Sequence, residues 1–263
     1  MFKNSGIHIH IVGCSPRSGT TLMQEMMVAC YRIDHHCEHE RSLFKEKIRF
    51  GGVTCTKHPH EVQYAGGALR ANKNLYFIYM VRDPRDVVVS RHANFPGAYF
   101  TGLDFYLRAE RCASRLADHP RFIVVRYEDL VRSPDSVQEF LERRLPFLER
   151  LHRFSEFHLH AKVSQDSSQA LNGVRPPDAK SIGGWRNHLP RVSAQLRKFP
   201  AANDVLIRYG YEQSTKWTEI LPPANDQDAL SVISEREGLK NAFRMKWKVI
   251  RRTSRYWLRL KAK

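Results

Sequence analysis

The sequence predicts an α/β fold with a P-loop-like central parallel sheet flanked by helices, followed by a basic amphipathic helix at the C-terminus. Over the N-terminal half, β-rich or apolar runs alternate with segments of helical spacing, a pattern typical of parallel sheets covered by helices. A turn rich in glycine and hydroxyl residues, 13–21, joins the first expected strand to the first expected helix. Residues 240–263 contain 10 basic residues and no acidic one.

The expected elements follow one another along the chain. Strands are predicted at 7–13, 52–56, 74–81 and 121–126, and the nearly continuous apolar run at 74–81 is typical of a strand buried on both faces. Helices are predicted at 19–31, 84–93, 105–117, 133–144 and 190–209, and Pro84 and Pro134 fall in the first turns of two of them. The polar segment 164–180, with Pro176-Pro177 near its end, is expected to be a loop or lid.

We expect three regions along the chain: a domain at 1–214, a linker at 215–239 that contains Pro222-Pro223, and a basic tail at 240–263. The formal net charge is +16, of which the tail supplies +10, so the rest of the chain carries only +6. A basic excess predicts an anionic partner. Because most of the charge lies in the tail, the tail and the domain need separate explanations.

Composition narrows the class of protein. Hydrophobic residues make up 42% and aromatic residues 11%, which argues against a disordered chain. No apolar run approaches the roughly 18 residues that a membrane-spanning helix needs. The five cysteines include no CxxC pair, which argues against a disulfide scaffold and favours a reducing compartment. A strand-like segment follows Met1 too closely for a signal peptide, so we expect a cytoplasmic protein, with the option of peripheral attachment to the inner face of a membrane.

The turn 13–21 (GCSPRSGTT) is the most informative segment. Glycine and small hydroxyl residues let backbone N–H groups surround an anion, and the start of the following helix adds its dipole. The Walker A pattern ends in Gly-Lys-Ser/Thr, whereas here Gly19 is followed by Thr20 and the cation comes earlier, at Arg17. An ordinary nucleoside triphosphatase is therefore disfavoured, and the alternative is a strand–helix turn without a ligand.

A second segment has the composition of a phosphate clamp. Arg82 ends the apolar run at 74–81, and Ser90 follows eight residues later in the expected helix. A bidentate guanidinium and a hydroxyl near a helix start suit a phosphate group. The alternative is a surface network between Arg82 and the nearby Asp83 and Asp86.

These motifs resemble those of the sulfotransferases, which use 3′-phosphoadenosine 5′-phosphosulfate (PAPS). The turn 16–22 (PRSGTTL) is similar to the family's 5′-phosphosulfate loop, Arg82 and Ser90 to its 3′-phosphate pair, and 180–187 (KSIGGWRN) to the late segment that closes over the nucleotide. The resemblance covers about 7–211 and implies the sulfotransferase fold, PAPS as donor, and these cofactor-binding residues: Pro16, Arg17, Ser18, Gly19, Thr20, Thr21, Arg82, Ser90, Lys180, Gly184, Trp185 and Arg186. For Trp185, an anchor that packs the loop is the alternative.

Sulfuryl transfer needs stabilised sulfuryl oxygens, a neutralised leaving oxygen and a base. Arg17 suits the first role. Lys57 suits the second, because 55–59 (CTKHP) resembles a Lys-x-Pro segment of the tyrosylprotein and carbohydrate branches; the alternative is a solvated lysine.

The segment 36–41 (HCEHER) resembles the one that carries the base in tyrosylprotein sulfotransferases, although Cys37 stands where the family has glycine. We rank Glu38 first as the base, then His39 and Glu40, with His58 and His60 as further options. PAPS chemistry requires no metal. The histidine pairs 8/10, 35/36, 58/60 and 158/160 lack carboxylates at a recognised metal spacing, so we expect no metal site.

The tail has two distinct faces when drawn as a helix. One face groups Phe243, Trp247, Ile250, Trp257 and Leu258, and the other groups Arg244, Lys248, Arg251, Arg252, Arg255 and Arg259. A basic, aromatic-rich amphipathic helix suits an anionic membrane surface. The alternative is a helix that docks its apolar stripe on the domain and leaves its basic face in solvent. Nucleic acid is not expected as a partner, because no nucleic-acid-binding module accompanies the charge.

The leading hypothesis is a PAPS-dependent sulfotransferase that acts on a hydroxyl of a saccharide or glycolipid. A tyrosine or peptide O-sulfotransferase and a P-loop small-molecule kinase are the alternative enzymes, and a basic adaptor that binds membranes or nucleic acid is the alternative outside enzymes. Acceptor pockets of the resembled family are lined by variable loops, here expected at 95–103 and 164–180.

Overall fold

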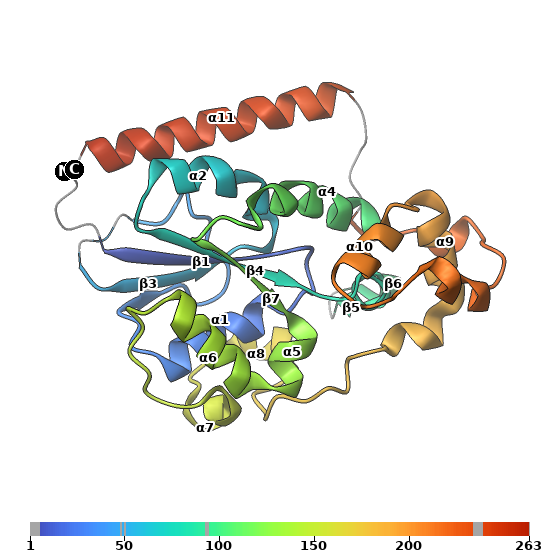
Figure 1. Ribbon diagram of the computed structural model, residues 1–263, viewed down its shortest axis with the longest axis horizontal. Coiled ribbons are helices and arrows are strands. Elements are labelled where there is room, and N and C mark those ends of the chain that lie inside the picture. Colours follow the sequence, from blue (N-terminus) through green and yellow to red (C-terminus); the bar gives the residue numbers. More distant parts are fainter. Residues whose placement is uncertain (1–5, 48, 50, 93–94, 234–238, 263) are drawn as a thin grey trace.

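A five-stranded parallel sheet forms the centre of the protein (Figure 1). The computed structural model describes residues 6–47, 49, 51–92, 95–233 and 239–262. The strands lie in the order β2-β3-β1-β4-β7, with bounds β1 (Ile7–Gly13), β2 (His35–His36), β3 (Val53–Lys57), β4 (Leu75–Val81) and β7 (Phe122–Arg126). A second, antiparallel pair consists of β5 (Arg91–His92) and β6 (Phe95–Tyr99). The predicted α/β class, with a parallel sheet flanked by helices and a C-terminal helix, is confirmed.

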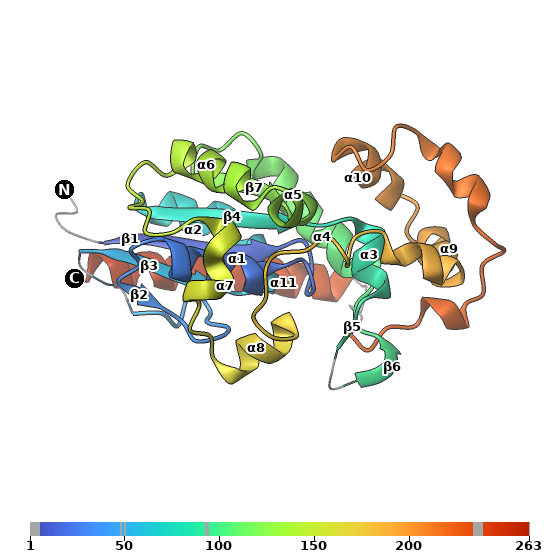
Figure 2. The ribbon, with the colours of Figure 1, turned by 90° about the horizontal axis from the view of Figure 1, so that it is seen from below.

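Helices cover both faces of the sheet (Figures 1 and 2). One face carries α1 (Thr20–Cys30), α5 (Tyr127–Arg132), α6 (Pro134–Arg144), α7 (Phe157–His160) and α8 (Gln165–Leu171). The other carries α2 (Ala65–Ala71), α4 (Leu103–Ala113) and α11 (Leu239–Lys261). Beyond the sheet lie α3 (Pro84–Val89), α9 (Leu189–Lys198) and α10 (Ala202–Arg208). The 3₁₀ turns are η1 (Pro59–Tyr64), η2 (Ser114–Leu116), η3 (Phe154–Glu156), η4 (Gly184–His188), η5 (Thr215–Ile220) and η6 (Gln227–Ala229).

Strand β4 shows why the apolar run is continuous. Phe77 and Tyr79 enter the core beneath α2 and α4, whereas Ile78 and Met80 enter the core beneath α1 and α6. Side chains alternate between the two faces of a strand, so a strand with helices on both sides must be apolar at every position.

Several segments differ in detail from the sequence expectation. The helix expected at 190–209 is divided into α9 and α10 by a break at 199–201, where Pro200 cannot continue the hydrogen-bond ladder. The helix expected at 84–93 ends at Val89, and Ala93 lies outside the described residues. The polar segment 164–180 contains α8, and the stretch 215–233 contains η5 and η6. Fully buried Arg191 of α9 holds that stretch by donating to the carbonyl oxygens of Asp228 and Leu230.

The C-terminal helix α11 packs along α2 as an outer layer (Figure 1). Tyr256 is buried and accepts a hydrogen bond from Asn72 Nδ2 at 2.9 Å. A Cβ on Gly67 of α2 would lie 2.6 Å from Thr253, so this glycine permits the close approach of the two helices. The docked face is therefore not the expected apolar stripe, most of which stays in solvent; the side chain of Phe243 lies outside the described residues.

The turn between β1 and α1 depends on backbone conformations that favour glycine. Gly19 has φ +91°, and a Cβ there would lie 2.5 Å from the ring of Tyr127. Arg17 has φ +72°, an uncommon conformation for a residue with a side chain. The turn therefore packs directly against α5, which brings Tyr127 beside the anion-binding motif that the sequence predicts.

Replacing Gly19 with alanine should destabilise the protein more than an alanine at another left-handed glycine. Gly210 has φ +69°, and a Cβ there would have no atom within 4 Å, so Gly210→Ala measures the backbone cost alone, about 1 kcal/mol. Gly19→Ala adds the collision with Tyr127, for a total of about 2 kcal/mol or more. Urea unfolding followed by circular dichroism measures both variants, and equal losses would contradict the close packing of the turn.

Candidate active site

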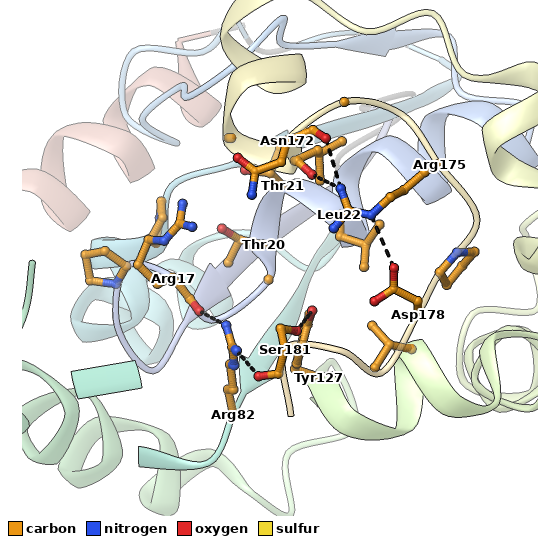
Figure 3. A pocket seen from close by; sticks show the side chains of 18 of the residues that line it. Arg17, Thr20, Thr21, Leu22, Arg82, Tyr127, Asn172, Arg175, Asp178 and Ser181 are labelled. Carbon is orange, nitrogen blue, oxygen red and sulfur yellow. Dashed lines mark hydrogen bonds and ion pairs between the residues drawn. The ribbon is translucent and has the colours of Figure 1, made fainter. Parts of the chain in front are cut away.

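A pocket of about 410 Å³ opens where the central strands end. Its lining includes Arg17, Thr20 and Thr21 from the β1–α1 turn, Arg82 from the end of β4, and Tyr127 from the start of α5. The segment 170–178 and Ser181 complete the wall (Figure 3). The carboxyl ends of parallel strands are the usual place for ligands in open α/β sheets.

Arg82 is the centre of a polar cluster in the pocket. Its Nη1 donates to the carbonyl oxygen of Arg17 at 3.0 Å, and its Nη2 donates to the carbonyl oxygen of Ser181 at 2.8 Å (Figure 3). The guanidinium lies over the ring of Tyr127, 4.5 Å from the centroid. The Tyr127 hydroxyl is 2.7 Å from Ser181 Oγ. Three segments distant in the sequence therefore meet around one cation.

Arg17 and Arg82 bring two positive charges to the pocket. Within the described residues neither forms an ion pair with a carboxylate, and the Nε atom of each is buried without a hydrogen-bond partner. Burial, followed by the charge of Arg82, lowers the pKa of Arg17. An anion between the two guanidiniums would offset their mutual repulsion, because it supplies the opposite charge. It would also supply the missing hydrogen-bond acceptors.

The segment 164–180, expected as a loop or lid, contributes a third arginine that the sequence analysis did not select. Arg175 lines the pocket and donates from Nη1 to the carbonyl oxygens of Leu171 and Asn172 at 2.8 and 3.0 Å. Its Nε lies 3.3 Å from Asp178 Oδ2. In Figure 3, Arg17 and Arg175 lie on opposite sides of the first turn of α1. The only sequence signal for Arg175 was its place immediately before Pro176-Pro177 in the expected lid.

The three candidate bases occupy different environments. His39 and Glu40 line the pocket. Glu38 is exposed and does not line it; its carbonyl oxygen accepts hydrogen bonds from the hydroxyls of Ser164 and Ser167. Glu38 thus connects this segment to the start of α8, whereas His39 and Glu40 face the space where a substrate would bind.

Lys57 ends β3 and is 0% exposed, which contradicts the alternative of a solvated lysine. Its Nζ lies 3.4 Å from Nδ1 of His39. Burial lowers the pKa of Lys57, and the charges of Glu40 and other acidic groups partly oppose this effect. Burial, followed by the charge of Lys57, lowers the pKa of His39. Lys57 does not line the pocket itself, so its described contact with the pocket passes through His39.

A buried carboxylate that the sequence analysis did not select lies near Lys57. Glu25 of α1 is only 5% exposed, and burial raises its pKa, an effect that Ser167 and the charge of Lys57 partly offset. The expected amphipathic pattern of α1 gave no reason to place an acidic residue inside. His60, a further option for the base, lines the pocket, and burial lowers its pKa; His58 does not line the pocket.

The remaining candidates from the sequence divide into residues that line the pocket and residues that do not. Ser18 is fully buried, and the Ser90 hydroxyl donates to the carbonyl oxygen of Asp86 at 3.0 Å. Lys180 is exposed and does not line the pocket. Gly184, Trp185 and Arg186 also lie outside the lining, whereas Pro16, Gly19, Thr20 and Thr21 belong to it.

Trp185 is a packing centre. It is 2% exposed, and the guanidiniums of Arg85 and Arg186 lie 4.1 and 4.6 Å from its ring centroid. The backbone N–H groups of Gly183 and Trp185 donate to the carboxylate of Asp86 at 2.8 and 3.0 Å. These contacts hold the late segment against α3, so that Ser181 reaches Arg82.

Metal ligands do not gather in the described residues: no group of three or more His, Cys, Asp or Glu side chains there is placed to hold a metal ion. The chemistry of the pocket is that of an anion site, with guanidiniums, hydroxyls and the start of a helix.

Comparison with known proteins gives a family match in the part of the chain that contains Lys57, Arg82 and Tyr127. Residues 29–145 match the model of the sulfotransferase family. No curated protein sequence matches the chain significantly.

Three solved structures are among those to which this chain is similar. The sulfotransferase domain of the Synechococcus PCC 7002 olefin synthase is 17% identical, with a TM-score of 0.45, and the match covers 70% of this chain and 89% of that one. A mouse sulfotransferase complexed with PAP is 15% identical, with a TM-score of 0.48 and coverage of 77% and 85%. A retinol dehydratase in complex with androsterone and the inactive cofactor PAP is 13% identical, with a TM-score of 0.42 and coverage of 79% and 81%.

The family match begins at the end of α1 and ends just after α6. It therefore includes the strands that carry Lys57 and Arg82, although the turn 13–21 precedes it. The resemblance found in the sequence is confirmed by this match of residues 29–145 to the sulfotransferase family.

Proposed function

We propose that this protein transfers a sulfuryl group from PAPS to an acceptor hydroxyl. The observation that carries the proposal is the pair Arg17 and Arg82, which face one pocket without a carboxylate partner among the described residues. Such a pair is costly unless an anion binds between its members. A donor with phosphate and sulfate groups supplies such an anion, and the family match supports sulfuryl transfer as the reaction.

The residues present fit PAPS. The buried donors without partners, Arg17 Nε, Arg82 Nε and Ser18 Oγ, surround the turn before α1 in the described part of the chain. We assign the turn 16–21 and Arg17 to the 5′-phosphosulfate and Arg82 to the 3′-phosphate. When bound, PAPS supplies the activated sulfuryl group.

Ser90, Lys180, Gly184, Trp185 and Arg186 remain predictions as nucleotide contacts. The Ser90 hydroxyl would have to leave the carbonyl oxygen of Asp86 to bind a phosphate. The other four belong to the segment that Asp86 anchors, so their contribution would require this segment to rearrange over the nucleotide.

The proton positions favour Glu40 as the base. When Lys57 is charged, its ammonium donates to Nδ1 of His39, so the neutral imidazole holds its own proton at Nε2. His39 is then a donor, and Lys57 holds a positive charge behind it. Glu40 lines the same pocket and can accept the proton of the hydroxyl, whereas Glu38 does not reach the lining. We therefore place Glu40 first, with His39 as the second candidate.

The acceptor that we propose is a hydroxyl on a saccharide or glycolipid, with a peptide tyrosine as the alternative. Phe100, Phe157 and Leu171 give the pocket apolar surfaces on which a sugar or phenol ring can stack. Transfer of radiolabelled sulfate from PAPS to a panel of a glycolipid, its free oligosaccharide and a tyrosine peptide distinguishes these acceptors. We expect labelling of the first two and not of the peptide.

The reaction product 3′-phosphoadenosine 5′-phosphate (PAP) should bind the folded protein, and Arg17→Ala and Arg82→Ala should each weaken binding by about tenfold or more, because each removes a charge-assisted contact. Isothermal titration calorimetry measures the affinities. Arg143→Ala is the matched control, because Arg143 is an exposed arginine of α6 outside the pocket. Failure of the folded protein to bind PAP, with binding of ATP and Mg²⁺ instead, would favour the kinase alternative.

The pH dependence of kcat/KM should have an alkaline limb. Activity is lost as pH rises through the pKa of Lys57, because the neutral amine no longer provides positive charge. Burial lowers that pKa from 10.5, so the alkaline limb should lie below pH 10.5.

Two substitutions test these assignments. Lys57→Arg should move the alkaline limb to higher pH, since a guanidinium keeps its charge. Glu40→Gln should lower kcat by about 100-fold, because the amide cannot accept the hydroxyl proton. Glu38→Gln is the comparison between neighbouring carboxylates: a large loss of kcat in this variant, with kcat retained in Glu40→Gln, would contradict our choice of base. Circular dichroism verifies that each variant is folded.

A further inference from the structure

Helix α11 presents a ridge of large apolar side chains to solvent. Trp247, Ile250, Trp257 and Leu258, here called the α11 ridge, are 59%, 56%, 40% and 56% exposed. Their spacing places them along one side of the helix. Single exposed apolar residues also occur elsewhere, such as Leu159 and Leu230, and need no explanation. Four on one face of one helix form a continuous surface.

The docking of α11 fixes the direction in which the ridge points. The opposite face carries Tyr256, which is buried against Asn72, and Arg259, which donates to the carbonyl oxygens of Phe44 and Glu46 at 2.6 and 2.8 Å. Turning the ridge inward would break these contacts and expose Tyr256. The domain therefore cannot cover the ridge while α11 keeps this position.

Cationic side chains border the α11 ridge. Arg244, Lys248, Arg251 and Arg255 are exposed, and Nζ of Lys261 lies 3.9 Å from the ring centroid of Trp257. The sequence 239–263 contains no acidic residue. The surface thus combines aromatic and aliphatic groups with positive charge along a helix of 23 residues.

We propose that the α11 ridge inserts into the interface of an anionic lipid bilayer, with the bordering cations against the headgroups. Helices of this kind lie in the plane of the interface, where apolar side chains enter the acyl boundary and lysine and arginine meet anionic lipid. The helix would lie on the membrane rather than cross it, because no helix in the described residues is long and apolar enough to span a bilayer. This association is separate from the transfer reaction.

Charge favours a bilayer over other occupants of this surface. In a two-fold pair of chains joined through the ridge, the cations of one copy would face those of the other. A nucleic acid would pair with the positive charge but would leave the exposed aliphatic side chains of Ile250 and Leu258 without an apolar partner. An anionic bilayer satisfies the charge and the apolar surface together.

Flotation of the full chain with vesicles tests the proposal. The protein should bind vesicles of phosphatidylcholine containing about 30% phosphatidylserine, bind pure phosphatidylcholine less, and be released by salt. The double variant Trp247→Ser/Leu258→Ser should weaken partitioning by about tenfold or more, because it removes two of the most exposed apolar side chains of the ridge. Arg251→Gln/Arg255→Gln should weaken binding to the anionic vesicles to a similar degree.

Matched substitutions outside α11 separate the ridge from general surface hydrophobicity. Leu159→Ser/Ile220→Ser replaces two side chains that are 68% and 56% exposed, and should leave vesicle binding unchanged. Circular dichroism and PAP binding should be unchanged in all these variants, so a failure of this proposal is distinguishable from a failure of the proposed enzyme function.

Three results would overturn the proposal. The first is absence of binding to the anionic vesicles by the folded chain. The second is equal binding by wild type and Trp247→Ser/Leu258→Ser. The third is a ridge-dependent dimer in light scattering, or a ridge-independent complex with nucleic acid, either without vesicle binding.

Discussion

The carboxylate of Asp86 connects the two parts of the chain that form the pocket. It accepts the backbone N–H groups of Gly183 and Trp185, and so fixes a late segment to helix α3, almost one hundred residues earlier. Arg85, beside it, lies against the rings of Trp185 and Trp217 and pairs with Asp83. Burial raises the pKa of Asp86, and the two N–H donors oppose this rise. This anchor acts together with the hydrogen bonds from Arg82 and Tyr127 to hold Ser181 at the pocket.

Acidic and basic side chains have different structural roles at the site. The carboxylates of Asp83, Asp86 and Glu128 accept hydrogen bonds from the backbone, while Arg17 and Arg82 line the pocket and each keep an Nε without a hydrogen-bond partner. These carboxylates therefore stabilise the backbone around the site and form no ion pair with Arg17 or Arg82 in the described part of the chain. A buried guanidinium is tolerated here because carbonyl oxygens satisfy part of its donors, and the rest of its hydrogen-bonding capacity is available to a ligand.

Local sequence patterns predicted the features that depend on residues close together in the sequence. The apolar run of β4 and the glycine-rich turn have strong local signals, and the structure places both at the sheet edge that forms the pocket. Helix α2 was missed because its seven residues (AGGALRA) include two glycines, and it is stabilised by packing against α11. The contact between Lys57 and His39, and the position of Arg175, join segments distant in the sequence, so no spacing rule could find them. For the same reason, no local pattern indicates that Glu40 lines the pocket whereas Glu38 does not.

The backbone of Arg17 has a consequence for how this protein can change. Its left-handed φ of +72° costs conformational energy that glycine would avoid. Glycine at this position would relax the fold and at the same time remove a cation from the pocket. Conformational stability therefore favours glycine at position 17, whereas anion affinity favours arginine. The proposed anion site, rather than the backbone conformation, accounts for an arginine at this position.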